Sequence, residues 1–139
     1  MKNLLLAFSV LLFSAAASAQ SKKAEDVIKF KETVYDFGKI KQGVPVTHDF
    51  EFTNVSDKPV VIEHASASCG CTTPTWPQAP VGKGKSDKIK AGFNAAAIGT
   101  FTKPITVKVA GIDVPVQVTI KGEVLTADAY SKIEKTPAK

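Results

Sequence analysis

The sequence predicts an all-β fold in which about seven to eight strands form two antiparallel sheets that pack face to face. Apolar and polar residues alternate over most of residues 28–124, which is typical of strands with one buried face. Clusters of Gly, Pro, Ser and Asp interrupt this alternation at short intervals, and helical periodicity is almost absent. At 139 residues, with 44% apolar and 22% charged residues, the chain has the size and composition of one globular domain.

The first 19 residues have the features of a secretory signal peptide. Lys2 supplies a positive charge, residues 4–13 form an apolar stretch, and Ala17-Ser18-Ala19 matches an A-x-A cleavage site. We therefore expect an exported mature chain, periplasmic or secreted, that begins at Gln20. No Cys lies near the cleavage point, so the expected product is not a lipoprotein. No later segment has the roughly 18 apolar residues that a membrane span needs.

The domain itself is expected over residues 28–124, after a flexible lead-in at 20–27. Its clearest strand covers residues 46–54, where Phe50 and Phe52 alternate with polar residues. Turn signals separate the runs at 43–45, 56–59, 82–84 and 110–113. In chain order, we expect strands near 28–30, 33–40, 46–54, 59–65, 67–73, 86–94, 100–109 and 114–124.

The last two strands contain prolines, and the chain then loses its alternation. Pro104 and Pro115 cannot donate to a strand ladder, so they belong at strand starts, edges or bulges. Residues 125–139 form a C-terminal tail, in which 127–134 fits one or two helical turns or a frayed end. The shared core is expected to contain Phe50, Phe52, Ile62, Phe93, Phe101, Val107 and Val118.

The charge pattern argues against nucleic-acid binding. The chain has 18 Lys, no Arg and a formal charge of +5, with the Lys residues spread over its whole length. Arg is the residue best suited to bidentate contacts with phosphate and guanine, so its absence removes the usual means of recognition. Export away from the cytoplasm points the same way. We expect no nucleic-acid partner.

Four segments together resemble a known bacterial family. They are Y-D-F-G-K-I at 35–40, F-E-F-T-N at 50–54, S-C-G-C-T-T-P at 68–74 and G-T-F-T-K at 99–103. The chain is similar to domain of unknown function 1573, and to the wider set of sperm-protein-like and cilia-associated immunoglobulin-like modules, from residue 33 to about 124. The resemblance implies an exported, often periplasmic, immunoglobulin-like module without an established catalytic activity. It transfers no catalytic residues, and Ala110 stands where such domains often carry Asn.

Most of the first two segments has a folding interpretation. Tyr35 and Phe37 lie two residues apart and share a face, so both can anchor the first long strand in the core. Gly38 permits a close approach or an unusual dihedral angle where that strand ends. Asn54 can satisfy backbone groups as its strand turns into residues 56–59.

Cys69 and Cys71 are the residues with the clearest chemistry, and three states remain open for them. Export favours a disulfide, but its loop is so short that the bond would be labile and redox-active, with Gly70 required for the tight bend. Two thiolates on one strand face, with His64 or His48, also suit copper or zinc. The third state is a pair of reduced or simply oxidised cysteines at a strand entry, whose side chains pack as small apolar groups. A thioredoxin-type enzyme is disfavoured because no helix follows the motif.

Three further residues are candidates for a site. His48 is in phase with Phe50 and is expected to face inward, whereas His64 ends a strand near the surface. Trp76 lies in a proline-rich connection after the cysteines. It is either a binding anchor beside Cys69 and Cys71, or a plug that covers the open edge of the sandwich.

These features favour a non-enzymatic module that binds an envelope or extracellular protein, or assists cell-envelope assembly. No Ser-His-Asp set, phosphate loop or complete metal cage can be assembled from the sequence. The alternatives are a periplasmic thiol-redox or copper- or zinc-binding protein that uses Cys69, Cys71 and His64, and a carbohydrate-binding module that uses Trp76 and Tyr35. No other cofactor is expected.

Overall fold

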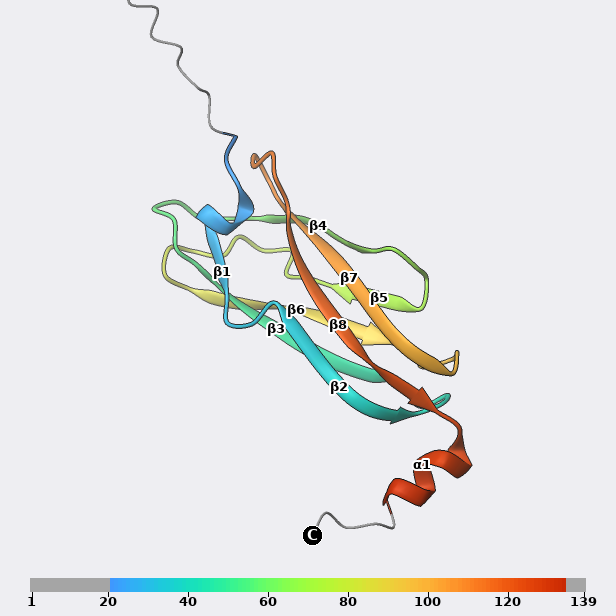
Figure 1. The fold of residues 1–139 in the computed structure, drawn as a ribbon. Coiled ribbons are helices and arrows are strands. Elements are labelled where there is room, and N and C mark those ends of the chain that lie inside the picture. Colours follow the sequence, from blue (N-terminus) through green and yellow to red (C-terminus); the bar gives the residue numbers. More distant parts are fainter. Residues whose placement is uncertain (1–20, 135–139) are drawn as a thin grey trace, which may run out of the picture.

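The computed structural model describes residues 21–134 as a sandwich of two four-stranded sheets (Figure 1). The predicted signal peptide lies outside the described residues. The strands are β1 (Ile28–Phe30), β2 (Val34–Lys41), β3 (Val46–Asn54), β4 (Ile62–Ala67), β5 (Thr72–Thr75), β6 (Ser86–Phe93), β7 (Gly99–Val109) and β8 (Val116–Leu125). A short 3-10 helix, η1 (Ala24–Asp26), precedes them, and helix α1 (Ala127–Glu134) follows. No helix among residues 21–134 is long and apolar enough to cross a bilayer.

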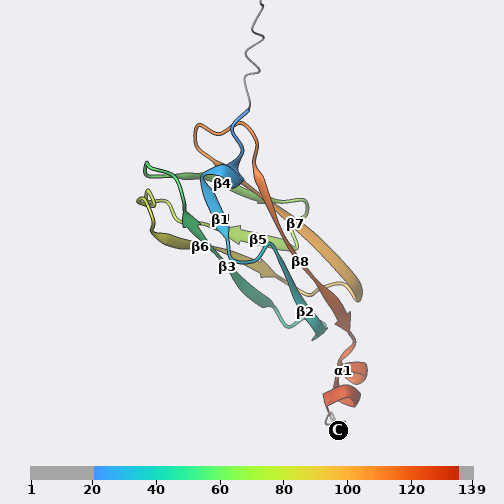
Figure 2. The same ribbon diagram turned by 60° about the vertical axis from the view of Figure 1, so that its left-hand side comes forward.

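The strand order is that of an immunoglobulin-like sandwich. One sheet has the order β1-β3-β6-β5 and the other β2-β8-β7-β4, so the chain changes sheet at every connection except those from β5 to β6 and from β7 to β8. The prediction of two purely antiparallel sheets is wrong in one place, because β2 pairs parallel to β8. The layers are visible in both views (Figures 1 and 2).

The core between the sheets contains all seven residues predicted for it. Phe50 and Phe52 of β3 are completely buried, and Phe93 stacks on Phe101 with 4.0 Å between the ring centroids. These aromatic rings bridge the two sheets and bury the largest apolar surfaces in the domain. The seven confirmed core residues are Phe50, Phe52, Ile62, Phe93, Phe101, Val107 and Val118.

Two predicted strands begin or run differently in the structure. The strand expected at 59–65 begins at Ile62. The strand expected at 67–73 is wrong, because residues 68–71 form the turn by which the chain crosses from one sheet to the other. The next strand begins only at Thr72. Because Ser, Cys and Gly offer no bulky apolar side chain on alternate positions, nothing in that stretch distinguishes a turn from a strand.

Pro104 lies inside β7, a central strand, at a point where no donor is needed. The backbone N–H of its partner Thr119 donates to Thr33 O at 2.7 Å, so Thr119 faces β2 rather than β7. The nitrogen of Pro104 therefore points away from β8, toward the side on which β4 pairs with β7. The pairing with β4 stops at Ile105, so no strand lies opposite Pro104 on that side. A proline is tolerated there for the same reason as on an edge strand.

Both ends of the described chain contact the sandwich. The expected flexible lead-in is attached from Lys22 to Val27: Ala24 is completely buried and its N–H donates to Val114 O at 2.8 Å. After β8, the C-terminal segment forms α1 at the opposite end of the sandwich from η1 (Figure 1). None of the side chains of α1 is buried.

Candidate functional site

Cys69 and Cys71 form a disulfide in the turn between β4 and β5, where the chain crosses from one sheet to the other. Their Cα atoms are 5.3 Å apart, and both residues are half-buried. The backbone N–H of Thr72 donates to Cys69 O at 3.3 Å, and that of Asn94 donates to Cys71 O at 3.1 Å. Hydrogen bonds at both ends therefore hold the turn independently of the sulfur–sulfur bond.

Gly70, between the two cysteines, is not required by the backbone. Its φ lies outside the left-handed region, and a Cβ added to it would meet no atom within 4 Å. The expectation that the bend needs a glycine is therefore wrong, because the chain turns here with ordinary dihedral angles. Gly70 is exposed, so no side chain stands at its position on the outer side of the turn.

We expect loss of the disulfide to leave the fold intact. Replacing both Cys69 and Cys71 by Ala should lower the free energy of unfolding by about 1.5–2 kcal/mol, since so short a loop restricts the unfolded chain very little. Urea unfolding followed by fluorescence of Trp76, the only Trp in the chain, measures this. A loss above about 4 kcal/mol would show instead that the disulfide is a structural cross-link.

Cys71 also lines a small hollow of about 150 Å³ between β7 and the loop that precedes it. Phe93 and Phe101 belong to its lining, and Ile98, which is 57% exposed, lies at its margin. Lys103 is the one charged residue in the lining, and within residues 21–134 it forms no hydrogen bond or ion pair. The hollow thus has a mainly apolar lining with one Lys residue, and Cys71 of the disulfide is part of that lining.

The same part of β7 has an open backbone edge. In the described residues β4 pairs only with Ile105 to Val109, so 99–103 has β8 on one side and no strand on the other. Thr100 and Thr102 are in phase with Pro104, which means that their N–H and C=O groups point away from β8. Both residues are exposed.

His64 and Trp76 meet each other rather than the cysteines. His64 lies within β4, not at its end, and its ring packs edge-on against Trp76 with 5.2 Å between the centroids. Trp76 is half-buried and packs against the core, with its indole N–H buried and unpaired among the described residues. This placement is that of a plug beside β4.

Within residues 21–134 no three His, Cys, Asp or Glu side chains gather as a metal site would require.

His48 faces inward, as predicted, and its hydrogen-bonding partner is the side chain of Glu32. Its Nε2 lies 2.9 Å from Oε1 of Glu32, and its ring stacks on Tyr35 with 3.6 Å between the centroids. Tyr35 in turn packs edge-on against Phe37. Both aromatic residues of β2 are half-buried against the core, so this set fixes the crossover between β1 and β2.

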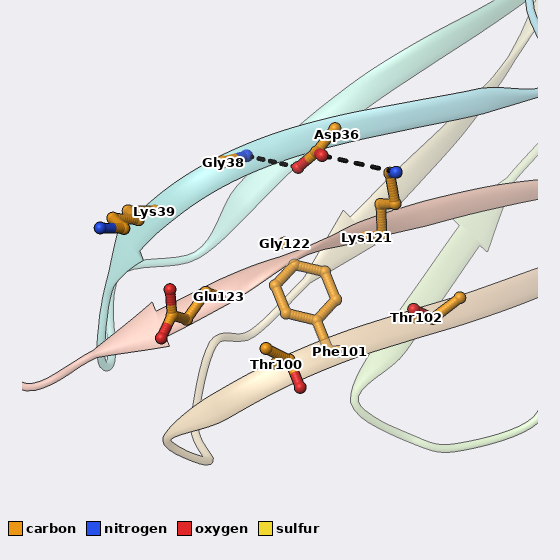
Figure 3. A pocket seen from close by; sticks show the side chains of 9 residues that line it. All are labelled: Asp36, Gly38, Lys39, Thr100, Phe101, Thr102, Lys121, Gly122 and Glu123. Atoms are coloured by element: carbon orange, nitrogen blue, oxygen red, sulfur yellow. Dashed lines mark hydrogen bonds and ion pairs between the residues drawn. The ribbon is translucent and has the colours of Figure 1, made fainter.

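Asp36 and Gly38 of the Y-D-F-G sequence line a shallow hollow of about 390 Å³ on β2, β7 and β8 (Figure 3). Gly38 has a φ of 65° and lies in a bulge inside β2, rather than where the strand ends. Oδ1 of Asp36 accepts a hydrogen bond from the Gly38 N–H at 2.8 Å, and Oδ2 lies 3.6 Å from Nζ of Lys121. These contacts belong to the fold, because they satisfy the bulged backbone.

The outer face of the β1-β3-β6-β5 sheet carries paired charges. Nζ of Lys88 lies 2.6 Å from Oδ2 of Asp49, and Lys31 pairs with Glu51 at 2.7 Å. The hydrogen bond from Lys88 holds the pKa of Asp49 below its usual value. Because these pairs are exposed and neutralise each other, the face resembles an ordinary solvated surface.

Sequence reasoning found the cysteines, His64 and Trp76, but missed the three features that surround the disulfide. Thr72, Lys103 and the open edge at Thr100 and Thr102 are ordinary residues in sequence terms. The position of Thr72 directly after Cys71 was the one sequence signal that could have placed any of these residues beside the disulfide. The other two acquire their surroundings from strand pairing between distant segments.

Comparison with known proteins supports the architecture. The model of the family described as "Protein of unknown function (DUF1573)" matches residues 28–124. The ASH/PapD-like domain 7 of human CEP192 is similar with a TM-score of 0.63 and 12% identity, over 89% of this chain and 99% of that one. No curated protein matches the chain.

Two other solved structures share the fold over part of their length. A protein of unknown function from Porphyromonas gingivalis W83 has a TM-score of 0.59 and 16% identity, over 81% of this chain and 51% of that one. The Vibrio cholerae VesB protease has a TM-score of 0.57 and 14% identity, over 73% and 33%. The chain thus spans about half of the first protein and a third of the second. At such identities, the likeness concerns the fold alone.

Proposed function

From the premise that the chain belongs to the DUF1573 family, we propose that it is an exported, non-catalytic module that binds another envelope or extracellular protein. The partner supplies an extended segment, which adds to the open edge of β7 at 99–103. The unpaired N–H and C=O groups of Thr100 and Thr102 carry this proposal, because backbone groups of this kind are the template for strand addition.

The other sheet edges are less suited to accept a strand. β1 has only three residues, and β2 is interrupted by a bulge between Asp36 and Lys39. β5 contains Pro74, which removes a backbone donor, and β4 lies beside the plug formed by His64 and Trp76. The β7 edge combines an uninterrupted ladder to β8 with exposure on its free side.

The surroundings of the edge define the partner segment. The hollow beside it is lined by Phe93 and Phe101 and bordered by Ile98, so it suits an apolar side chain. Lys103 lies in the same lining without an acidic partner among the described residues. We therefore expect a short extended segment that carries one apolar side chain, with an acidic residue close to it. Export to the periplasm or beyond rests on the signal-peptide features of residues 1–19.

Site-specific photo-crosslinking in the native host tests the proposal. A photoreactive residue at Ile98 should capture the partner, whereas one at Val55 should not, although the two positions are 57% and 53% exposed. Adding Thr102→Pro should reduce capture at least tenfold, because proline removes the donor on the free side and none from the ladder to β8. Thr102→Val keeps the N–H and should bind normally.

Two outcomes of this experiment would contradict the proposal. Equal capture at positions 98 and 55 would show that the β7 edge is not the binding surface. Capture that persists in Thr102→Pro, with the protein still folded by circular dichroism, would show that strand addition is not the mode of binding.

A further inference from the structure

We propose that the Cys69–Cys71 disulfide is a reversible redox centre that oxidises a dithiol of another protein. The inference goes beyond binding at the β7 edge and does not depend on it. Each molecule passes on one disulfide and is left reduced, so the exchange is stoichiometric and consistent with a module that is not a catalyst. It rests on four features of the turn: the short loop, the backbone hydrogen bonds that hold it, a hydroxyl that reaches both sulfurs, and a cation beside Cys71.

The fold neither needs the disulfide nor resists its opening. The loop spans a sequence separation of two, so closing it gives the folded state little entropic advantage. The hydrogen bonds from Thr72 N–H to Cys69 O and from Asn94 N–H to Cys71 O keep the turn in place when the sulfurs separate. A disulfide that contributes little to stability is correspondingly easy to reduce.

The reduced form has groups that stabilise a thiolate. Thr72 is 3% exposed, and its Oγ1 lies 3.9 Å from Sγ of Cys69 and 4.0 Å from Sγ of Cys71. Within residues 21–134 these sulfurs are the hydrogen-bonding contacts that the hydroxyl makes. A buried hydroxyl with no other partner can donate to a thiolate, and Lys103, which lines the same hollow as Cys71, is the cationic residue whose charge would favour that thiolate.

The arrangement also assigns different roles to the two sulfurs. Cys71 lines the hollow with Lys103, so it is the better leaving group. Gly70 is exposed and leaves the outer side of the turn uncovered. We therefore assign Cys69 as the sulfur that an incoming thiolate attacks.

The exchange balances without any further reactant. A thiolate of the partner's dithiol bonds to Sγ of Cys69, the Cys69–Cys71 bond breaks, and Cys71 leaves as a thiolate. The partner's second thiolate then attacks the partner's first sulfur, which is bonded to Cys69 in the mixed disulfide, and Cys69 is released as a thiolate. Two electrons pass from the partner to the cysteine pair. The partner's two thiol protons go to solvent, which can return them to Cys69 and Cys71.

The first experiment is a redox titration of the purified mature protein in glutathione buffers, with thiols trapped by alkylation and counted by intact mass. We expect both cysteines to become reduced in millimolar reduced glutathione near pH 7. A disulfide that stays intact in glutathione and opens only with excess dithiothreitol would overturn the proposal, because that is how a structural disulfide behaves.

Variants separate the roles of the neighbouring groups. Thr72→Val removes the hydroxyl at nearly constant volume, and Lys103→Gln removes the charge. Each should lower the equilibrium constant for reduction by glutathione about tenfold, and should slow the alkylation of Cys71 in the reduced protein at neutral pH. Thr72→Ser, which keeps the hydroxyl, and Lys29→Gln on β1 should behave as the wild type.

A trapping variant tests the assigned direction of attack. With Cys71→Ala, Cys69 has no internal partner, and oxidised glutathione should form a stable mixed disulfide with it. Reaction of the reduced wild-type protein with substoichiometric iodoacetamide should modify Cys71 first, because it carries the stabilised thiolate. Preferential modification of Cys69, or unchanged equilibrium constants in both Thr72→Val and Lys103→Gln, would refute the proposed roles.

Discussion

Replacing Asn54 by Ala is expected to lower the free energy of unfolding by about 3–5 kcal/mol. Asn54 is the last residue of β3, and its side chain is completely buried. Its Nδ2 donates to Lys58 O at 2.8 Å and to Val81 O at 2.9 Å. Its Oδ1 accepts hydrogen bonds from the N–H and the hydroxyl of Ser56 at 2.9 and 2.8 Å. One amide therefore connects its own turn to a loop 27 residues further along the chain.

The size of the effect follows from what the substitution leaves behind. An alanine would remove four side-chain hydrogen bonds at once, would leave the carbonyl of the buried Val81 with the Val60 N–H as its remaining donor, and would open a gap where the amide lay. A loss of this size is a large part of the roughly 5–15 kcal/mol that stabilises an ordinary domain. Asn54→Asp should do at least as much harm at neutral pH, because a carboxylate would face two carbonyl oxygens in place of a donor.

Guanidinium unfolding, followed by circular dichroism, measures the change. The matched control is Asn94→Ala: Asn94 is exposed and its side chain accepts one hydrogen bond, from Ala96 N–H at 3.1 Å, so the loss there should stay below about 1 kcal/mol. Similar losses for the two asparagines would show that the buried network at Asn54 does not hold the loops together.

Asn54 also shows which contacts of a residue can be predicted from the sequence and which cannot. Local signals, namely an Asn at the end of an alternating run followed by Ser56 and Pro59, are enough to predict that it satisfies its own turn, and the structure confirms this. The hydrogen bond to Val81 could not be predicted, because it depends on where a distant loop returns. The same limit applies to β2: alternation predicts the strand, but its parallel pairing with β8 is a matter of tertiary arrangement.

The candidate site divides in the same way. The cysteines stand out because few residue types carry their chemistry, and a short disulfide loop was one of three open states. The turn conformation, the position of Thr72 beneath both sulfurs and the presence of Lys103 arise from the crossing of the chain between sheets. The sequence left Trp76 as either a plug or an anchor; in the structure its ring contacts His64 and packs against the core.

Replacing Gly122 by Ala is expected to destabilise the domain by about 1–3 kcal/mol, since it inserts an atom where there is no space. A Cβ on Gly122 would lie 2.8 Å from the backbone oxygen of Gly38, and 2.9 and 3.0 Å from Cζ and Cε1 of Phe101. Phe101 is the cross-strand neighbour of Gly122, and its ring lies close to that glycine (Figure 3). Because the ring is also stacked on Phe93, it has little freedom to move aside.

The strain should therefore pass to the bulge in β2, whose carbonyl at Gly38 is the nearest atom. Gly70→Ala is the matched control: it adds the same methyl group in open space at an ordinary φ, and should change the stability by less than about 0.5 kcal/mol or increase it slightly.

A double-mutant cycle with Phe101→Leu identifies the cause. The smaller side chain should relieve part of the clash, so that Gly122→Ala costs at least 0.5 kcal/mol less in the Phe101→Leu background than in the wild type. Strict additivity of the two substitutions, or a Gly122→Ala variant as stable as Gly70→Ala, would mean that the close approach of β2, β7 and β8 at this point does not require a glycine.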